Sequence, residues 1–396
     1  MELTTKQKEG LEIAVRRYKE QKPYTCIAGY AGTGKSTLIN FIIDALGVDK
    51  NNEVCYVAFT GKAATVLRAK GCPNATTAHR LLYHARPKSD GSGFIFVKKS
   101  RTEFAHLKVI VVDEVSMLPK DMWELLLTRG VYILATGDPG QLPPVDRDSD
   151  NHVLDNPHVF LDEIMRQAQD SEIIRLSMWV REGKDIADFP CKNEQVMIVS
   201  EKDLNTGMYS WADQILCATN AKRKEINCTV RAIKGYGFEP CVGDKVIGLT
   251  NHWGFCSNSG EWDLTNGSIG TITHMDKKDV YFPPWICKEP VTHLYTTISI
   301  DDDPTDTFDY IPIDYKYLTQ SVPALTSYQQ AQLRKRKMEG PYDFSYAYAI
   351  TTHKAQGSEW DKVLIFEERW PTGEEHARWL YTAITRARYK VVIVRK

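Results

Sequence analysis

Several features that would mark a specialised class of protein are missing from this sequence. The 50 Lys and Arg residues are balanced by 51 Asp and Glu residues, so no overall positive field indicates a nucleic-acid partner. Such a partner would have to be held by a local cleft. The nine cysteines contain no Cys-x-x-Cys pair, which argues against a disulfide framework or a zinc site and favours free thiols in a reducing compartment.

Membrane and targeting signals are also missing. No apolar run approaches the length that spans a bilayer, and the first residues lack an apolar signal core. The sequence has no internal repeat and no low-complexity segment. We therefore expect a cytoplasmic protein with no membrane partner.

The 396 residues, of which 42% are hydrophobic, suffice for two to four domains. In the first part of the chain, short apolar runs alternate with amphipathic segments, which predicts an α/β domain with a parallel sheet covered by helices. A turn-centred break between His84 and Ser100 predicts a small hairpin. The apolar runs are Tyr24–Ala28, Val54–Phe59, Val109–Val112 and Val131–Thr136.

The rest of the chain predicts a second α/β domain that is interrupted by a β-rich insertion. Helix-like spacing returns from about Leu161, and Gln214–Ala218 resembles a strand. Short β-like runs separated by turn residues occupy residues 237–333 and predict a small β-barrel. The α/β pattern then resumes, with strand-like runs at Val363–Phe366 and Val391–Val394.

The most informative segment is the glycine loop Gly29–Thr37. It follows an apolar strand and opens a helix, which is the order of a phosphate-binding loop. The glycines let backbone N–H groups converge on an anion, and the helix N-terminus adds partial positive charge. Lys35 is placed to reach the β- and γ-phosphates, and Ser36 to hold Mg²⁺. The sequence therefore predicts a site for a nucleoside triphosphate.

Two later loops predict the rest of this site. The strand Val109–Val112 ends in Asp113 and Glu114, which indicates one carboxylate for Mg²⁺ and a second that polarises the attacking water. Gln141 lies in a loop framed by Gly and Pro, where a glutamine can sense whether a γ-phosphate is present.

Taken together and in this order, these segments resemble the motifs of superfamily 1 helicases. Within that superfamily the chain resembles the RecD/Dda-like branch, superfamily 1B, which translocates 5′ to 3′ on single-stranded DNA. The similarity runs from Leu3 to the last residues and is weakest in the hairpin and the β-rich insertion. Segments 29–37, 113–117 and 137–145 resemble motifs I, II and III, and segments 161–167, 348–358 and 380–388 resemble motifs IV, V and VI.

The resemblance implies two RecA-like phosphate-loop domains in tandem. Residues 1–83 and 101–155 would form the first domain, 1A, with residues 84–100 as an inserted β-hairpin, 1B, that acts as a wedge. The second domain, 2A, would contain residues 156–236 and 334–396. Residues 237–333 would form an SH3-like β-barrel insertion, 2B.

The resemblance also implies roles in binding ATP and Mg²⁺. Arg166 and Arg386 match two arginines that approach the γ-phosphate from the second domain, and Gln7 matches a glutamine that contacts adenine. The implied catalytic residues are Lys35, Asp113, Glu114, Gln141, Arg166 and Arg386, and the metal ligands are Ser36 and Asp113. The implied nucleotide-binding residues are Gln7, Gly32, Thr33, Gly34, Lys35, Ser36, Thr37 and Gly357.

A track for single-stranded DNA across both domains is implied as well. Its candidates are Thr60, Gly61, Lys62, Thr77, His79, Thr351, Thr352 and His353. Because base stacking on aromatic rings suits sequence-independent binding, Trp253 is a candidate platform, and Phe94 and Phe96 are candidates for the wedge. The basic run Arg334–Lys337 is a candidate either for a phosphate contact or for a solvated face.

These expectations describe an ATP-dependent 5′-to-3′ DNA helicase. It would act as a monomer on single-stranded DNA and on junctions of single- and double-stranded DNA, beside replication or single-strand-binding proteins. The compact length is compatible with a bacteriophage Dda-like helicase, so the resemblance implies the cytoplasm of a bacterium or of a phage-infected host. Two alternatives stay open. One is an RNA helicase or a nucleic-acid-dependent remodelling translocase, because phosphate contacts do not read the sugar. The other is a nucleotide-gated DNA-binding or loading factor without processive unwinding.

Overall fold

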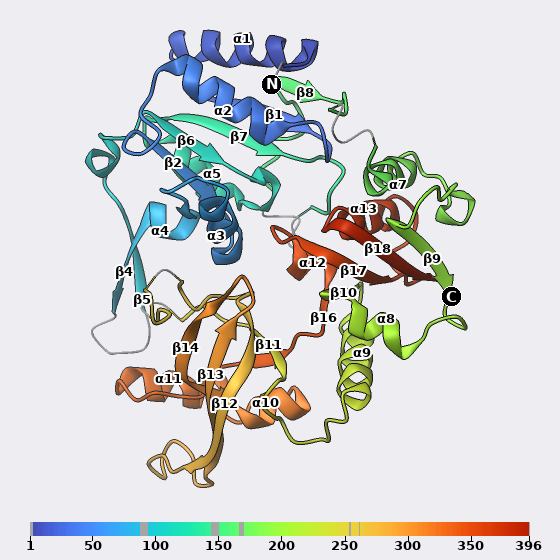
Figure 1. The fold of residues 1–396 in the computed structure, drawn as a ribbon. Coiled ribbons are helices and arrows are strands. Elements are labelled where there is room, and N and C mark those ends of the chain that lie inside the picture. Colours follow the sequence, from blue (N-terminus) through green and yellow to red (C-terminus); the bar gives the residue numbers. More distant parts are fainter. Residues whose placement is uncertain are drawn as a thin grey trace.

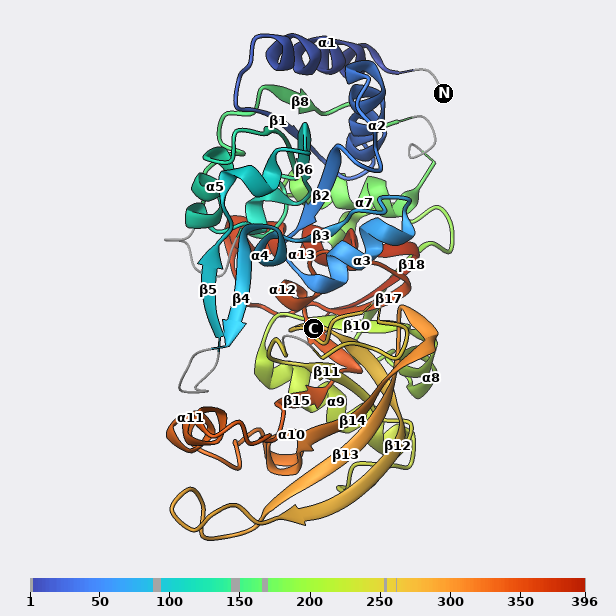
Figure 2. The same ribbon diagram turned by 90° about the vertical axis from the view of Figure 1, so that its left-hand side faces the viewer.

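The computed structural model describes residues 3–87, 94–143, 150–165, 170–252, 255–260 and 262–395. Over these residues the chain forms two parallel sheets, a five-stranded antiparallel sheet and a separate two-stranded antiparallel pair. Figure 1 shows the first parallel sheet at the top, the second at its lower right and the antiparallel sheet below, and Figure 2 shows the same arrangement from the side. The protein is therefore a mixed α/β structure.

The first parallel sheet has the strand order β3-β2-β6-β7-β1-β8. Its central strands are buried on both faces, as is usual for a parallel sheet, and the four predicted strands are confirmed to within one residue at each end. We call the sheet and its helices the first lobe. The strands are Tyr24–Gly29 (β1), Val54–Ala58 (β2), Thr76–Thr77 (β3), Val109–Val112 (β6), Tyr132–Gly137 (β7) and Val159–Leu161 (β8). The helices are Thr5–Lys19 (α1), Lys35–Leu46 (α2), Gly61–Ala69 (α3), Ala78–Leu82 (α4) and Lys120–Leu127 (α5).

The first lobe extends further along the chain than predicted. Strand β8 pairs in parallel with β1, with Gly29 opposite Leu161, so the predicted boundary after residue 155 is wrong. A strand of three residues is too short for its hydrophobic pattern to show in the sequence. The pairing brings the following residues back to the glycine loop, where the Met165 N–H donates to the Gly32 carbonyl at 3.0 Å.

The second parallel sheet has the strand order β16-β10-β17-β18-β9 and forms the second lobe. Helices α7 and α13 pack on one face of the sheet, and α8 and α9 pack on the other. The strands are Val196–Ser200 (β9), Gln214–Cys217 (β10), Ala349–Thr351 (β16), Trp360–Phe366 (β17) and Ala387–Arg395 (β18). The helices are Glu172–Arg181 (α7), Thr206–Trp211 (α8), Asn220–Ile233 (α9), Thr352–Ala355 (α12) and Gly373–Ile384 (α13).

The antiparallel sheet has the order β14-β13-β12-β11-β15, and we call it the β lobe. One of its strands, β15, lies beyond residue 333, where the predicted insertion ends. The strands are Lys245–Gly248 (β11), Ile269–Val280 (β12), Val291–Ile300 (β13), Asp303–Asp314 (β14) and Phe344–Tyr346 (β15). The helices beside them are Tyr315–Gln320 (α10) and Ser327–Lys335 (α11).

A two-stranded pair projects from the first lobe, as Figure 2 shows at the left. Strands Tyr83–Pro87 (β4) and Phe94–Lys98 (β5) run antiparallel, with Tyr83 opposite Lys98. The predicted hairpin falls on these strands, and its connecting residues, 88–93, lie outside the described residues. In the part of the chain that the structure describes, no helix is both long and apolar enough to cross a membrane.

Candidate active site

The glycine loop links strand β1 to helix α2, as the sequence predicts. Gly32 and Gly34 both have φ of 77°, in the left-handed region that favours glycine. Gly34 has a second reason to be glycine, because a Cβ atom at that position would lie 2.2 Å from Met165 Sδ. The loop therefore holds a conformation that other residues would resist, and its backbone curls at the start of α2.

Lys35 folds back onto the loop that precedes it. Its Nζ donates to the carbonyls of Gly29 at 2.6 Å and Tyr30 at 3.0 Å. Burial lowers the pKa of Lys35, and the nearby carboxylates of Asp138, Asp113 and Glu114 act in the opposite direction. The ammonium group thus already lies inside the loop, where a phosphate can replace the two carbonyls as its partner.

Gln7 lies behind the loop rather than on a solvated helix face. Its side chain is 1% exposed, and its Nε2 donates to the carbonyls of Thr33 at 3.2 Å and Gly34 at 3.4 Å. Its Oε1 accepts from the Thr4 N–H at 3.0 Å, which completes a capping box at the start of α1. The residue therefore braces the loop, in addition to any contact with a base.

Asp113 and Glu114 lie at the end of β6, on the edge of the sheet that faces the loop. Asp113 Oδ1 accepts from the Thr136 hydroxyl at 2.8 Å and from the Glu114 N–H at 3.0 Å, which fixes its carboxylate. The Ser36 hydroxyl and the Asp113 carboxylate line the same cleft. These two oxygen donors suit Mg²⁺, which keeps several waters and needs few protein ligands.

Glu114 has an unusual backbone and an unusual carboxyl group. Its φ of 49° and ψ of 52° place a non-glycine residue in the left-handed region, a strain that is common at functional sites. Burial raises the pKa of Glu114, and the positive charges of Arg386 and Lys35 oppose that rise. A carboxylate with a raised pKa is better suited to accept a proton from water.

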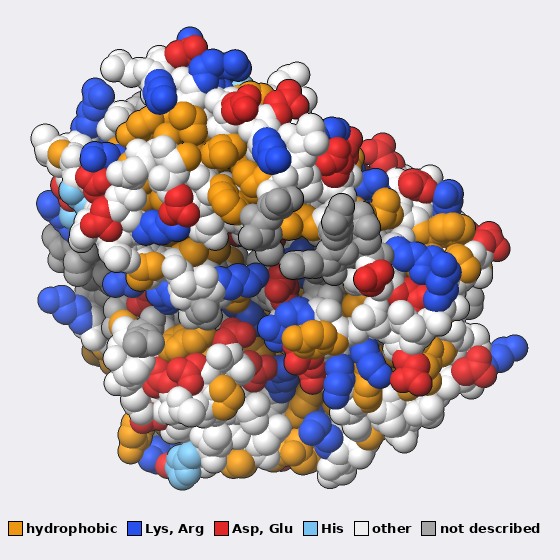
Figure 3. Space-filling model, turned by 45° about the horizontal axis from the view of Figure 1, so that its top comes forward, with side chains coloured by type: hydrophobic (Ala, Val, Ile, Leu, Met, Phe, Trp, Pro, Cys, Tyr) orange, Lys and Arg blue, Asp and Glu red, His pale blue; other side chains and the backbone are white. Residues whose placement is uncertain are grey.

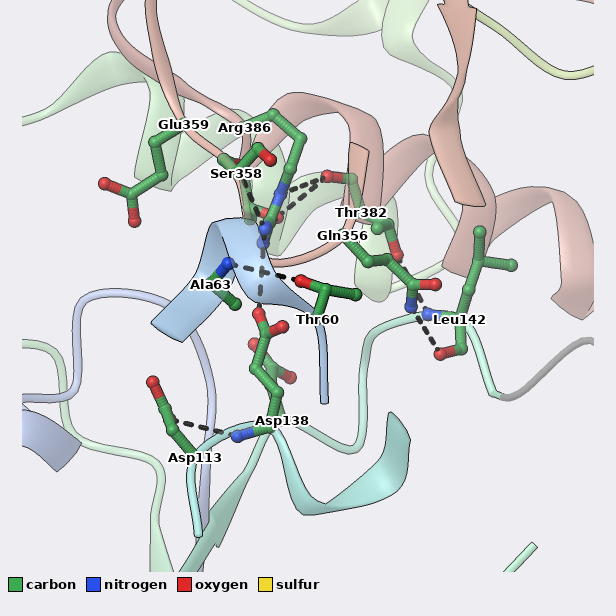
Figure 4. Close-up of polar contacts among 12 residues, drawn as sticks. Thr60, Ala63, Asp113, Asp138, Leu142, Gln356, Ser358, Glu359, Thr382 and Arg386 are labelled. Atoms are coloured by element: carbon green, nitrogen blue, oxygen red, sulfur yellow. Dashed lines mark hydrogen bonds and ion pairs between the residues drawn. The ribbon is translucent and has the colours of Figure 1, made fainter. Parts of the chain in front are cut away.

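The second lobe completes the site. Arg386 Nη1 lies 3.7 Å from Glu114 Oε1, and Figure 4 shows Arg386 beside Ser358 and Thr382 of its own lobe. Arg386 is 5% exposed, and it donates to the carbonyls of Thr382 at 3.2 Å and Ser358 at 3.3 Å. The backbone of the second lobe therefore holds this charge against the first lobe.

Gly357 and Gln356 make two further contacts between the lobes. Gly357 has φ of 75°, and a Cβ atom there would lie 2.9 Å from Ala63 Cβ and 3.3 Å from Glu114 Oε2. Gln356 Nε2 donates to the Leu142 carbonyl at 3.0 Å, as Figure 4 shows. The loop that carries Gln141 is thereby tied to the second lobe.

A cleft of about 560 Å³ collects most of the predicted nucleotide residues. Thr33 and Gln7 lie behind its wall, and Arg166 lies outside the described residues. Sequence reasoning missed Asp138, which lines the cleft, and Tyr381, which contacts Asp138, although both stand inside recognised motifs. The predicted residues that line the cleft are Gly32, Gly34, Lys35, Ser36, Thr37, Asp113, Glu114, Gln141, Gly357 and Arg386.

Several predicted nucleic-acid contacts lie at the edge of the first lobe. The hydroxyl oxygens of Thr60 and Thr77 cap helices α3 and α4 by accepting from Ala63 N–H and Arg80 N–H, each at 3.2 Å. Burial lowers the pKa of His79, which favours a neutral ring suited to stacking over an ion pair with phosphate.

Lys62 and Thr352, both predicted DNA contacts, are buried in this structure. Lys62 is 7% exposed, with its Nζ 3.5 Å from Asp302 Oδ2 and 4.7 Å from the centre of the Trp360 ring. Thr352 is fully buried, and its hydroxyl donates to the Cys217 carbonyl at 3.4 Å. In this conformation neither side chain is open to a phosphate, because each already fills a packed position between elements.

Other predicted DNA contacts are accessible to solvent or lie outside the described residues. Thr351 and His353 are partly exposed at the start of α12, and burial lowers the pKa of His353. Phe96 is 41% exposed on β5, and its ring centre lies 6.2 Å from that of His79. Trp253 lies outside the described residues, and Phe94 is described only as the first residue of β5.

The β lobe closes over the start of α3. A Cβ atom at Gly61 would lie 2.5 Å from Thr265 Oγ1, and Arg80 forms an ion pair with Asp263 at 2.7 Å. Figure 3 shows one face of the molecule, where a hollow crosses the surface and basic and acidic side chains are interspersed. The predicted DNA contacts of the first lobe thus face acidic and hydroxyl side chains of the β lobe.

The fold and the cleft define a phosphate-loop nucleotide-binding protein whose site is shared by two parallel-sheet lobes. Residues 2–202 match the family model described as AAA domain, and residues 346–394 match the UvrD-like helicase C-terminal domain. Because the first match covers just over half of the 396 residues, the chain belongs to this AAA-domain family. It is also similar to curated helicases named dda and RecD2.

Two curated relatives are named as ATP-dependent DNA helicases. The ATP-dependent DNA helicase dda of Enterobacteria phage T4 is 32% identical over 148 residues, which are 37% of this chain and 34% of that protein. The ATP-dependent RecD2 DNA helicase of Deinococcus radiodurans is 26% identical over 391 residues, which cover 91% of this chain and 45% of that protein. The chain thus spans less than half the length of these relatives.

Solved structures with the same fold include two of Pif1 helicases. One is described as Bacteroides Pif1 bound to ssDNA, with a TM-score of 0.55 and 19% identity. The other comes from work on DNA unwinding at forked dsDNA by two coordinating Pif1 helicases, with a TM-score of 0.57 and 19% identity. Each alignment covers 99% of this chain and 92% of the other. The chain therefore has a Pif1-like helicase fold.

Proposed function

We propose that this chain is an ATP-dependent DNA helicase that moves 5′ to 3′ along single-stranded DNA. One observation carries the proposal: the phosphate loop of the first lobe and Arg386 of the second lobe face one cleft, with Arg386 Nη1 3.7 Å from the Glu114 carboxylate. A site divided in this way makes hydrolysis depend on how closely the two lobes approach. Its relatives, which include DNA helicases, support the choice of reaction.

In the proposed reaction, each residue of the cleft has a role that its position allows. Lys35 and Arg386 offset negative charge on the transferring phosphoryl group, and Glu114 accepts a proton from the attacking water. Ser36 and Asp113 would hold Mg²⁺, which supplies charge neutralisation on the phosphates when it is bound. Gln141 links the presence of a γ-phosphate to the loop that contacts the second lobe.

In this proposal the lobes correspond to the domains of the family. The first and second lobes are two RecA-like domains in tandem, β4 and β5 form the wedge hairpin, and the β lobe is the SH3-like insertion. Single-stranded DNA crosses Thr60, Thr77 and His79 of the first lobe and continues to Thr351 and His353 of the second. The protein works as a monomer, because both halves of the nucleotide site lie in one chain.

Binding of DNA along this path requires the β lobe to move away from α3. The start of α3 is covered by Thr265, and Lys62 is paired with Asp302 of the turn before β14. A phosphate that approached Gly61 or Lys62 would compete with these groups. We propose that the nucleic acid replaces them, so Lys62 reaches DNA only after the β lobe has shifted.

The experiment that tests the function is hydrolysis of ATP with and without single-stranded DNA or RNA, followed by unwinding of duplexes with a 5′ or a 3′ tail. We expect stimulation by DNA and unwinding from the 5′ tail. Lys35→Ala serves as the control, and it should abolish hydrolysis while some DNA binding remains. A protein that ignored both polymers would disprove the helicase proposal, and unwinding only from 3′ tails would disprove the polarity.

A further inference from the structure

Tyr381 is a buried residue of the second lobe whose hydroxyl lies between two loops of the first lobe. The Ala31 N–H of the phosphate loop donates to the Tyr381 hydroxyl at 2.9 Å, and this hydroxyl donates to Asp138 Oδ2 at 2.6 Å. Tyr381 is 1% exposed, and Asp138 is 5% exposed. A phenol hydroxyl can donate one hydrogen bond and accept another, so this single group bonds to both loops at once.

Asp138 shapes the loop that carries Gln141. Its Oδ1 accepts from the Gly140 N–H at 2.9 Å, and its carbonyl accepts from the Gln141 N–H at 3.2 Å. Gly140 also packs closely against the tyrosine, since a Cβ atom there would lie 3.1 Å from Tyr381 Cε1. The phenol therefore contacts both the backbone that binds phosphate and the loop that senses it.

Tyr381 is connected to Arg386 through helix α13. The two residues are five positions apart, which is about 7.5 Å along a helix, and Arg386 follows the C-cap residue Thr385 of α13. The neighbouring Thr382 joins both sides, because its Oγ1 accepts from the Leu142 N–H at 2.9 Å and its carbonyl accepts from Arg386 Nε at 3.2 Å. A shift in the position of Tyr381 therefore also shifts the C-terminal end of α13, to which Arg386 is attached.

We propose that Tyr381 is a positioning residue that sets the register of α13, and with it Arg386, against the phosphate loop and the Gln141 loop. The inference rests on the proposed ATPase function, and it adds a residue that acts on the reaction through Arg386. Burial raises the pKa of Tyr381, and the neighbouring Asp138 adds to that rise, so the phenol keeps the proton that it donates. The Tyr381 hydroxyl can make both hydrogen bonds only when the second lobe lies against the first, which is the arrangement in which Arg386 reaches the cleft.

The test compares DNA-stimulated ATP hydrolysis by the wild type, Tyr381→Phe, Arg386→Ala and the double variant. Tyr381→Phe keeps the ring and removes both hydrogen bonds. We expect it to lower kcat about tenfold, while KM for ATP and the affinity for a fluorescent non-hydrolysable ATP analogue change less than twofold. In the Arg386→Ala background the same change should cost less than twofold further, because the arginine through which it acts is gone.

Tyr132→Phe is the matched control for loss of a buried phenol. Tyr132 is also buried in the first lobe, where its hydroxyl donates to the Ala14 carbonyl at 2.9 Å and hydrogen-bonds to the Thr25 hydroxyl at 2.6 Å. It is the first residue of β7, at the opposite end of that strand from the loop that carries Gln141. It should lower thermal stability about as much as Tyr381→Phe does and leave kcat unchanged. Asp138→Asn breaks the same contact from the other side and should reproduce the loss of kcat if Tyr381→Phe does not fold.

Each outcome decides between the possibilities. If the wild type hydrolyses ATP and Tyr381→Phe and Asp138→Asn match it, the function stands and the inference about Tyr381 is overturned. An equal loss of kcat in Tyr132→Phe, or a full tenfold further loss in the Arg386→Ala background, would also overturn it, because the effect would then be structural or independent of Arg386. A wild type without ATPase activity would overturn the proposed function, and the inference with it.

Discussion

Replacement of Arg386 by alanine is the sharpest test of the shared cleft. The side chain is 5% exposed, and the carbonyls of Thr382 and Ser358 hold its guanidinium toward the first lobe. The charge is thus ordered before the reaction, and no side-chain freedom has to be lost when the lobes close. Arg386→Ala removes this charge and leaves the carboxylate of Glu114, 3.7 Å away, without its cationic neighbour from the second lobe.

The magnitude follows from the position of the charge. An arginine that reaches a phosphoryl-transfer site from across a cleft contributes about 10³- to 10⁵-fold to kcat. This range corresponds to about 4 to 7 kcal/mol in the activation free energy. We expect the lower end, about 10³-fold, because part of the Arg386 charge is already offset by Glu114. Arg386→Lys should recover less than tenfold of the loss, since an ammonium group cannot keep both backbone carbonyls as partners and reach the cleft.

The assay is the steady-state rate of ATP hydrolysis at saturating single-stranded DNA, with KM for ATP measured in parallel. Arg378→Ala is the matched control on the same helix: Arg378 is exposed and pairs with Glu374 at 2.9 Å, an arrangement typically worth less than about 1 kcal/mol. It should change kcat less than twofold. If Arg386→Ala retained more than a tenth of the wild-type kcat, the second lobe would not complete the site and the reasoning above would be wrong.

Two further predictions concern Glu114 and Phe96. Glu114→Gln should reduce hydrolysis at least 100-fold and raise the melting temperature at pH 7.5 by a few degrees. Burial raises the folded-state pKa of Glu114 above its ordinary value, so ionisation of this carboxyl costs stability above the folded-state pKa. The difference in melting temperature between the variant and the wild type should shrink as pH falls to the unfolded-state pKa. A gain in melting temperature that persisted at that pH would contradict this explanation. Phe96→Ala should slow unwinding of a 5′-tailed duplex more than it slows DNA-stimulated hydrolysis, whereas Ile95→Ala, on the other face of β5, should affect neither; equal loss of both activities would favour a packing role for Phe96.

Much of the fold could be predicted from the sequence, because the signals are local. Short apolar runs predicted β1, β2, β6 and β7 to within one residue, since a central parallel strand is buried on both faces and consists mainly of apolar residues. The short strands β8 and β15 were missed. A run of three residues carries too little periodicity to be distinguished from a loop.

The predicted DNA contacts show where the assignment of roles to single residues from a family's motifs fails. A lysine beside a glycine at the start of α3 indicates a phosphate contact, but Lys62 is buried between Asp302 and Trp360. Those partners lie about 240 and 300 positions later in the chain, and no residue near Lys62 in the sequence indicates them. Whether a charged side chain meets solvent, a carboxylate or a ligand depends on which distant segment packs on it.

The phosphate loop could be predicted from the amino-acid sequence alone, because its strand, glycines, lysine and helix fall within about twenty consecutive residues and their geometry follows from local backbone rules. Arg386 could be identified from its motif. In contrast, the contact by which Tyr381, 350 residues after Ala31, joins that loop to Asp138, and the return of β8 to β1, became visible only in the folded protein. Such contacts depend on how whole sheets and helices pack, a property that no short stretch of sequence carries.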